Sequence, residues 1–325
     1  MTRSTPRHPD PSWLDRTSYP LSDAYVDVAG HEVHYVDTGA PPLAAGAPGE
    51  SPVPTVLFLH GNPTWSFVYR EIIARLALVA RCIAPDLPGF GLSQAAAGYR
   101  GTFVEHADAV ERFVSTMGLN DLVIVVQDWG GPIGLRLVER RPDLFRGVVI
   151  CNSWAWPVDA DPHFARFAGF MGGRVGSALI RRFNLFVNAL VPLGHRRRRL
   201  GRREMAQYRK PLATGARREF SAVLPREIVD TTPQLAQVAE GLGILDSLPV
   251  LIVWGDRDIA FREAELARWR AEVPGAEVHV VSGAGHFVQS DSPDEVAGVL
   301  RAWLEAEGLL AAENATAEES DTGRL

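Results

Sequence analysis

Four polar residues follow short apolar segments, at positions where they could take part in chemistry. They are Asn62, Asp128, Asp258 and His286. The strongest pattern surrounds Asp128, which closes the strand-like run 122–127 and is followed by Gly130, Gly131 and a helical segment over 132–140. This order predicts a buried parallel strand, a sharp turn and the start of a helix.

The turn at Asp128 has the form of a nucleophile elbow, in which a strained turn lifts one side chain above the carboxyl edge of a sheet. Ser is the usual occupant of that position, and here an acid replaces it. Gly130 stands two residues later, where the turn leaves little room for a β-carbon. Val126 stands two residues earlier, where the Ser form has Gly, so the match is partial. The alternative for Asp128 is a helix N-cap.

A carboxylate nucleophile needs a base for the second half of its reaction and an acid that orients the base. His286 is the candidate base, because it lies in a Gly-rich turn after the last expected strand. Asp256 and Asp258 lie together in an earlier turn, and from their position alone either could be the acid. Three other histidines lie in helical or inserted segments without comparable surroundings: His106, His163 and His195.

These candidates are expected to meet, because strands alternate with helices along the chain. That alternation predicts a mostly parallel sheet with right-handed crossovers, in which ligands bind beyond the carboxyl ends of the strands. The expected strands cover 56–59, 82–86, 122–126, 147–151, 250–254 and 277–281, with an antiparallel edge hairpin over 24–28 and 31–37. The expected helices cover 66–78, 103–117, 132–140, 261–271 and 293–307.

A change in composition interrupts this alternation. From 154 to 226 the β-branched runs disappear and Arg, Gly and Phe dominate, which predicts an inserted helical cap. The expected division is an N-terminal lead (1–23), an α/β core in two parts (24–153 and 227–307), the helical cap (154–226) and a disordered tail (308–325). The run Arg196–Arg199 is expected to form a solvated helical face, with binding of an acidic partner as the alternative.

Composition excludes several classes of protein. The 325 residues are 46% hydrophobic, which is enough to bury a full core. A net charge of −6 gives no reason to expect a nucleic-acid partner. Residues 1–16 have no signal-peptide pattern, and no run reaches the roughly 18 apolar residues of a membrane span. Cys82 and Cys151 are expected to be buried thiols in a reducing compartment, which predicts a cytoplasmic location.

Five stretches together resemble the α/β-hydrolase superfamily and, within it, the haloalkane dehalogenases. They are HGNPTW at 60–65, DLPGFG at 86–91, QDWGG at 127–131, WGDRD at 254–258 and GAGHF at 283–287. The resemblance covers the chain from about residue 25 to 305, and the chain order nucleophile, acid, histidine agrees with it. It is closest to the subgroup with an Asp-His-Asp triad and an Asn-Trp pair for the halide.

The resemblance implies a role for each candidate. Asp128 would be the nucleophile, His286 the general base and Asp258 the acid that orients it, because the family's acid is the second Asp of Trp-Gly-x-x-Asp. The side chains of Asn62 and Trp129 would bind the halide, and their backbone N–H groups would form the oxyanion hole. No cofactor and no metal is implied.

The position of the acid differs between relatives. Some carry it after the strand that precedes the cap, but the stretch 151–157 of this chain has no carboxylate, and the first one after it is Asp159. This favours Asp258. Asp256 is then expected to be a turn residue that satisfies backbone groups.

The implied reaction has two steps. The carboxylate of Asp128 displaces halide from an sp³ carbon and becomes an alkyl ester; with an ordinary aspartate pKa of about 3.9 it needs no activating base. His286 then deprotonates a water that hydrolyses the ester. The products are a primary alcohol, halide and a proton. The expected partners are a small haloalkane and water, without nucleic acid or membrane, and the substrate's chain length and the oligomeric state stay open.

Three other kinds of protein share part of this pattern of residues. An epoxide hydrolase also uses an Asp nucleophile, but it needs two cap tyrosines where this cap has only Tyr208, and Phe where this chain has Asn62. A fluoroacetate-type dehalogenase would have Arg in place of Trp129. A catalytically silent hydrolase-fold binding protein usually lacks a triad member, and all three are present here.

Overall fold

The central element is a sheet of eight strands in the order β1-β2-β4-β3-β5-β6-β7-β8. The structure, a computed structural model, describes residues 11–41 and 54–310. The strands are β1 (Asp23–Val28), β2 (His31–Asp37), β3 (Thr55–Leu59), β4 (Arg81–Pro85), β5 (Leu122–Gln127), β6 (Phe145–Cys151), β7 (Val250–Gly255) and β8 (Glu277–Val281). All pairings from β4 to β8 are parallel, while β1 with β2 and β2 with β4 are antiparallel. The predicted fold class, a mostly parallel α/β sheet, is therefore confirmed.

The predicted antiparallel hairpin lies at one edge of the sheet. Within the described ranges, strand β1 pairs with β2 alone, and their register runs from Asp23 opposite Val36 to Val28 opposite His31. Ala29 and Gly30 make the turn with φ of +52° and +86°. A turn with two residues at positive φ is the kind that matches the twist of the strands it joins.

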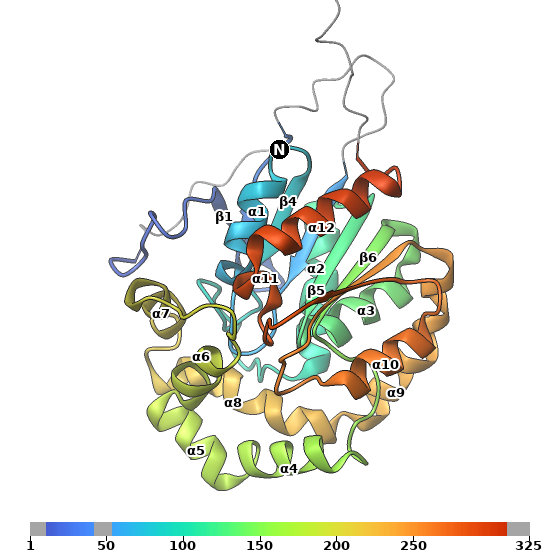
Figure 1. The fold of residues 1–325 in the computed structure, drawn as a ribbon. Helices are drawn as coiled ribbons and strands as arrows, with labels where there is room; N and C mark the ends of the chain where they lie inside the picture. Colours follow the sequence, from blue (N-terminus) through green and yellow to red (C-terminus); the bar gives the residue numbers. More distant parts are fainter. Residues whose placement is uncertain (1–10, 42–53, 311–325) are drawn as a thin grey trace, which may run out of the picture.

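Both faces of the sheet are covered by helices, as Figure 1 shows. In strand β5, Leu122, Ile124 and Val126 belong to one core cluster. Val123 and Val125 belong to the other cluster, on the opposite face. Because successive side chains of a strand point to opposite faces, a central strand with two covered faces is apolar at every position. This accounts for the uninterrupted apolar run from which the strand was predicted.

Each core cluster has its own helices. Helices α2 (Phe103–Met117), α3 (Gly130–Arg140) and α10 (Glu263–Glu272) supply the first cluster. Helices α1 (Arg70–Leu76) and α12 (Pro293–Ala306), beside the short α11 (Val288–Asp291), supply the second. The helix predicted over 66–78 is divided, because a 3-10 turn, η2 (Ser66–Tyr69), precedes α1. A second 3-10 turn, η3 (Pro142–Leu144), precedes β6.

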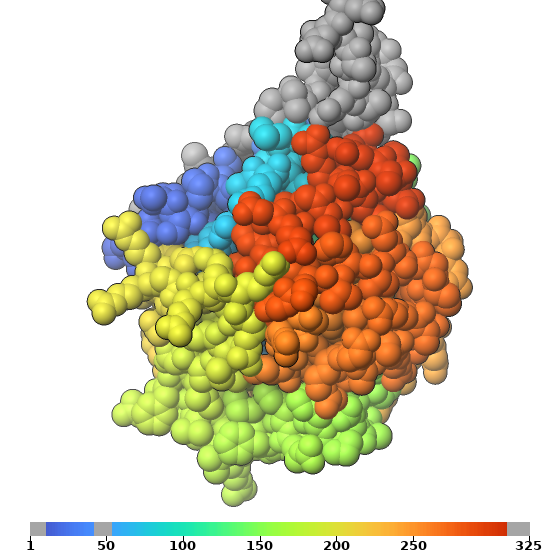
Figure 2. All heavy atoms as spheres, in the orientation of Figure 1, coloured from blue at the N-terminus to red at the C-terminus, as the bar shows by residue number. Residues whose placement is uncertain are grey.

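The segment between β6 and β7 contains helices and no strand. In chain order it holds α4 (Pro162–Met171), α5 (Arg174–Phe183), the π-helix η4 (Phe186–Leu190), α6 (Val191–Leu193), α7 (Arg202–Arg209), α8 (Gly215–Asp230), α9 (Thr232–Glu240) and the 3-10 helix η5 (Gly241–Ser247). Helices α4 to α8 gather at one end of the core in Figure 1, and Figure 2 shows them packed directly against it. Helix α9 and η5 instead pack on α3. The predicted boundary at 226 falls inside α8.

The arginine run does not form the predicted helical face. Residues 195–200 are irregular, although Arg196, Arg197 and Arg199 are exposed. The backbone N–H groups of Arg196, Arg197 and Arg198 donate to the carboxylate of Asp291 at 2.8–3.1 Å. Because that buried carboxylate satisfies three successive N–H groups, the segment needs no helical hydrogen bonds of its own.

Two further expectations concern the ends of the chain and the membrane. Residues 311–325 of the predicted tail lie outside the described residues, and Leu309, placed in that tail, is buried against the second core cluster. Among helices within 11–41 and 54–310, none combines the length and the apolar character that a bilayer crossing requires.

Candidate active site

Asp128 occupies a strained turn between β5 and α3. Its φ is +53°, in the left-handed region that non-glycine residues rarely adopt. Its backbone N–H donates to the oxygen of Asn152, and the hydroxyl of Ser153 donates to its backbone oxygen at 2.6 Å. These two bonds from the loop after β6 hold the strained conformation. The alternative reading of Asp128 as a helix N-cap is wrong, because α3 begins at Gly130 with Trp129 in the cap position.

The glycines around Asp128 allow close packing. A β-carbon on Gly130 would lie 2.2 Å from the backbone oxygen of Leu59, so no other residue fits there without a shift. Val126 departs from the Ser form of the motif, and Gly134 of α3 compensates for it. A β-carbon on Gly134 would lie 2.7 Å from Cγ1 of Val126. The small residue that lets strand and helix approach is therefore on the helix.

Asp128 lines a cavity, and its carboxylate has backbone donors. Its Oδ1 accepts a hydrogen bond from the backbone N–H of Asn62 at 2.8 Å, and the backbone N–H of Trp129 also donates to the carboxylate. The side chain keeps 13% of its surface exposed. Burial raises the pKa of Asp128, while His286 and the two backbone donors act in the opposite direction. Those donors favour the charged form that a nucleophile needs.

His286 connects Asp128 with Asp258. Nδ1 of His286 lies 2.9 Å from Oδ2 of Asp258, and its Nε2 lies 3.7 Å from Oδ2 of Asp128. Burial lowers the pKa of His286, but Asp258 and then Asp128 raise it, and the net direction is upward. Asp256 has a different partner, since it is exposed and its Oδ1 accepts from the backbone N–H of Gly283. Of the two acids, only Asp258 contacts His286.

Two buried amides that were given no role in the sequence also contact this group. Asn152, directly after β6, donates from Nδ2 to Oδ2 of Asp258 at 2.9 Å. Gln127, the last residue of β5, places its side-chain nitrogen 2.9 Å from Nε2 of His286. Their signal in the sequence is the one that identified Asp128, a polar residue that closes an apolar run.

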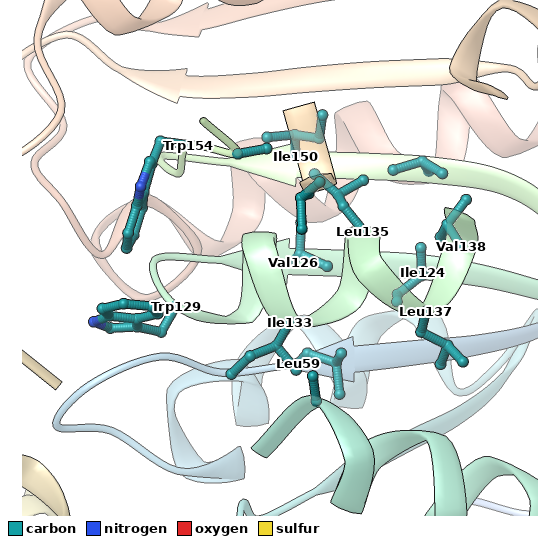
Figure 3. Packing of buried hydrophobic residues seen from close by; sticks show 14 of the residues in the cluster. Leu59, Ile124, Val126, Trp129, Ile133, Leu135, Leu137, Val138, Ile150 and Trp154 are labelled. Atoms are coloured by element: carbon teal, nitrogen blue, oxygen red, sulfur yellow. The ribbon is translucent and has the colours of Figure 1, made fainter. Parts of the chain in front are cut away.

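Asn62 and Trp129 line the same cavity as Asp128. Figure 3 shows the indole of Trp129 beside that of Trp154, beyond the ends of the strands. The two rings form an edge contact with centroids 4.8 Å apart, and the ring of Phe103 also packs on Trp129, with centroids 5.9 Å apart. Within the described part of the chain, no protein group accepts from the indole N–H of Trp129. Both residues can therefore offer an N–H to an anion in the cavity.

The cavity has a volume of about 190 Å³. An apolar cavity of roughly 150 Å³ holds a molecule the size of benzene, so the volume suits a small ligand. Its polar groups are few, and they include those of Asn62, Asp128, Trp129 and His286. The apolar wall comes largely from the helices between β6 and β7, through Phe164, Phe167, Phe186, Leu190 and Ile228. A small number of oriented polar groups in an apolar pocket is typical of a substrate site.

The remaining candidates lie elsewhere or have partners. His163 lines the cavity, but its Nε2 bonds to the backbone oxygen of Ala260. His106 bonds to Tyr99, and His195 to Val191 and Ser290, outside the cavity wall. No group of three metal-ligating side chains is found among residues 11–41 and 54–310.

Comparison with known proteins shows which proteins this chain is similar to. Residues 54–293 match the family model described as the alpha/beta hydrolase fold. Haloalkane dehalogenase 2 of Mycobacterium tuberculosis is 36% identical over 288 residues, which cover 88% of this chain and 96% of that protein. A cis-3-alkyl-4-alkyloxetan-2-one decarboxylase of Shewanella oneidensis is 30% identical, over 86% of this chain and 87% of that protein. The crystal structure of a haloalkane dehalogenase from Bradyrhizobium elkani superposes with a TM-score of 0.77 at 30% identity, covering 89% of this chain and 99% of that one.

Proposed function

The chain belongs to the α/β-hydrolase fold family and, within it, to the haloalkane dehalogenases, and we propose that Asp128 is the residue on which it hydrolyses carbon–halogen bonds. The observation that carries this assignment is an Asp carboxylate, held by two backbone N–H groups, in the wall of a small apolar cavity. The substrate class that follows is a short haloalkane, and the products are a primary alcohol, halide and a proton.

In the first step, an oxygen of Asp128 attacks the carbon that carries the halogen. The C–O bond forms as the carbon–halogen bond breaks, and the halide leaves with the bonding electrons. A halide in an apolar cavity is costly unless donors surround it. The indole N–H of Trp129 and the side-chain N–H of Asn62 are the donors, and both line the cavity.

In the second step, His286 removes a proton from a water that attacks the ester carbonyl of Asp128. The bond between the carbonyl carbon and the alkyl oxygen then breaks, the alcohol leaves with the proton returned from the imidazolium, and Asp128 is released as a carboxylic acid that loses its proton to solvent. The separation of 3.7 Å between Nε2 of His286 and Oδ2 of Asp128 leaves the imidazole close enough to direct a water at that carbon. The imidazolium is stabilised by Asp258, 2.9 Å from its Nδ1. The backbone N–H groups of Asn62 and Trp129, which already donate to this carboxylate, stabilise the oxyanion.

Epoxide hydrolysis fits the cavity less well. Opening an epoxide requires acid groups that protonate its oxygen, and no tyrosine is among the described residues of the cavity wall. Tyr208, the only tyrosine of the cap, is buried against Phe67 in the second core cluster.

Decarboxylation of a β-lactone is the second candidate, because the Shewanella relative is named for it. The cavity of about 190 Å³ favours a smaller substrate than an oxetanone with two alkyl chains.

We also infer a cytoplasmic location, which two buried free thiols, Cys82 and Cys151, support.

The deciding experiment uses His286→Phe. His286 acts only on the water of the second step, so this variant should release about one halide per active site from a bromoalkane and then stop. Intact mass should rise by the alkyl group, and peptide mapping should find it on Asp128. Asp128→Ala, the matched control, should give neither burst nor adduct.

Three parallel assays separate the alternatives in the wild-type protein: halide release from bromo- and chloroalkanes, diol formation from styrene oxide, and CO₂ release from a dialkyl β-lactone. A folded His286→Phe protein without a halide burst from any bromoalkane would contradict the assignment. An adduct formed only with the epoxide or only with the lactone would show that the protein catalyses that reaction instead. A protein that bound bromoalkanes without any adduct or turnover would be the silent binding protein.

A further inference from the structure

The side-chain amide of Asn62 is held by a residue of the helical segment between β6 and β7. The hydroxyl of Ser221, in α8, donates to Oδ1 of Asn62 at 2.7 Å. Nδ2 of Asn62 in turn donates to the backbone oxygen of Ser221 at 3.2 Å. The two residues are 159 positions apart in the chain, and both are buried, with 7% and 1% of their surface exposed. One residue of α8 thus binds both ends of the amide.

This pair of bonds fixes which end of the amide is which. The backbone oxygen of Ser221 can only accept, so the atom of Asn62 that faces it must be the nitrogen. A rotation by 180° would place two oxygen acceptors 3.2 Å apart, and it would turn the hydroxyl of Ser221 toward an NH₂ group. The observed orientation is therefore much the better one.

The orientation decides what the cavity offers to a ligand. An amide nitrogen has two N–H groups, and Ser221 takes one of them. Asn62 lines the cavity next to Asp128, and the second N–H has no protein acceptor among the described residues. In the rotated orientation the carbonyl oxygen of Asn62 would replace this N–H, and its negative partial charge would repel an anion in the cavity.

We propose that Ser221 is a positioning residue that makes the side chain of Asn62 a halide donor, so that the halide site is complete only when α8 is seated on the core. This inference rests on the proposed function, because it assigns a halide to the cavity. It acts through Asn62 alone, since Ser221 is not part of the cavity wall.

The test measures bromide binding directly, by quenching of tryptophan fluorescence in the intact protein without substrate. Ser221→Ala should weaken bromide binding on the order of 5-fold, the value of about one hydrogen bond. Ser221→Thr, which keeps the hydroxyl, should bind as the wild type does. Ser221→Cys keeps the volume with a much weaker donor, and should resemble Ser221→Ala even if the alanine variant folds poorly. Ser177→Ala, at another buried serine of this segment, is the control and should change nothing.

A double-mutant cycle separates a positioning role from a general structural one. In an Asn62→Ala background, Ser221→Ala should cause no further loss of bromide affinity, because its only route to the halide has been removed. An equal loss in both backgrounds, or unchanged bromide binding in both Ser221→Ala and Ser221→Cys, would overturn the inference. If the wild type turns over bromoalkanes and binds bromide while the Ser221 variants are unaffected, only this inference fails. A wild type that neither binds bromide nor releases halide would overturn the proposed function as well.

Discussion

The side-chain nitrogen of Gln127 lies 2.9 Å from Nε2 of His286 and 3.3 Å from the backbone oxygen of the same residue. The backbone oxygen can only accept, so the amide faces His286 with its N–H groups. Nε2 must then be an acceptor, and the ring carries its proton on Nδ1, where it donates to Asp258. This is the neutral form that a general base requires.

The first prediction concerns this contact. In the wild type, the Gln127 amide donates to Nε2 of His286 only when the ring is neutral, and this bond favours the neutral form. Gln127→Met removes the bond, so the pKa of His286 should rise further above its ordinary value. The acid limb of ester hydrolysis should then move to higher pH, and the hydrolysis rate at pH 7 should fall on the order of 5-fold. Single-turnover rates across pH measure it, with the halide burst as the control that stays unchanged. A limb that moved to lower pH would contradict the argument.

The second prediction separates the two acids. Asp258→Asn removes the charge that stabilises the imidazolium, and ester hydrolysis should slow by about 10⁴-fold. Asp256→Asn should be mild, because Asp256 contacts Gly283 and not His286. Halide release and adduct decay, measured in both variants, distinguish them. A reversed result would mean that the acid has been assigned to the wrong position.

The third prediction concerns the halide donors. Trp129→Phe keeps an aromatic ring that can contact Phe103 and Trp154 but removes the indole N–H. The halide-release step should slow by about 10²-fold, as for the loss of one preorganised donor, with little change in thermal stability. Asn62→Ala should have a similar effect on the same step. Unchanged burst rates in both variants would exclude these side chains from the halide site.

The fourth prediction uses a glycine beside the nucleophile. A β-carbon on Gly61 would lie 2.2 Å from Oδ1 of Asp128, so Gly61→Ala must displace that carboxylate. The rate of alkylation should fall on the order of 10²-fold, the typical cost of misplacing a reacting group by about 1 Å. Gly298→Ala is the matched control, because nothing lies within 4 Å of its β-carbon and it sits within α12. Equal activity in the two variants would show that the turn can adjust.

The fifth prediction concerns stability. His34 is fully buried between Asp86, 2.8 Å from its Nδ1, and Asp23, 3.1 Å from its Nε2. Burial alone would lower the pKa of His34, but the two carboxylates raise it to about 9. Protonated His34 therefore stabilises the fold below pH 6.5, by at most about 3 kcal/mol, and this contribution is lost as the pH rises through 9.

Urea unfolding at pH 6 and pH 9 tests this sign. The wild type should lose stability over this interval relative to His34→Gln, which cannot titrate there. If the free energies of unfolding of the two proteins differed by the same amount at both pH values, His34 would be buried in its neutral form.

The sequence by itself determined the strands, the turns and the position of the proposed nucleophile. The run 122–127 was predicted to be a buried strand because a strand covered on both faces is apolar at every position, and this pattern is local. Parallel strands also bring their carboxyl ends to one edge of a sheet. The sequence could therefore predict one common site without knowledge of any contact between its residues. These residues are Asn62, Asp128, Asp258 and His286.

The tertiary structure decided what connects these residues to the segments around them. Gln127 meets His286 across 159 positions, and Ser221 meets Asn62 across the same separation, so no local pattern contains either pair. The arginine run is not a helix, because Asp291, more than 90 residues later, accepts its backbone N–H groups. Periodicity reports which face of an element is buried. The partner of each buried side chain depends on how the helices between β6 and β7 pack on the sheet. That packing involves residues far apart in the chain, so periodicity does not reveal it.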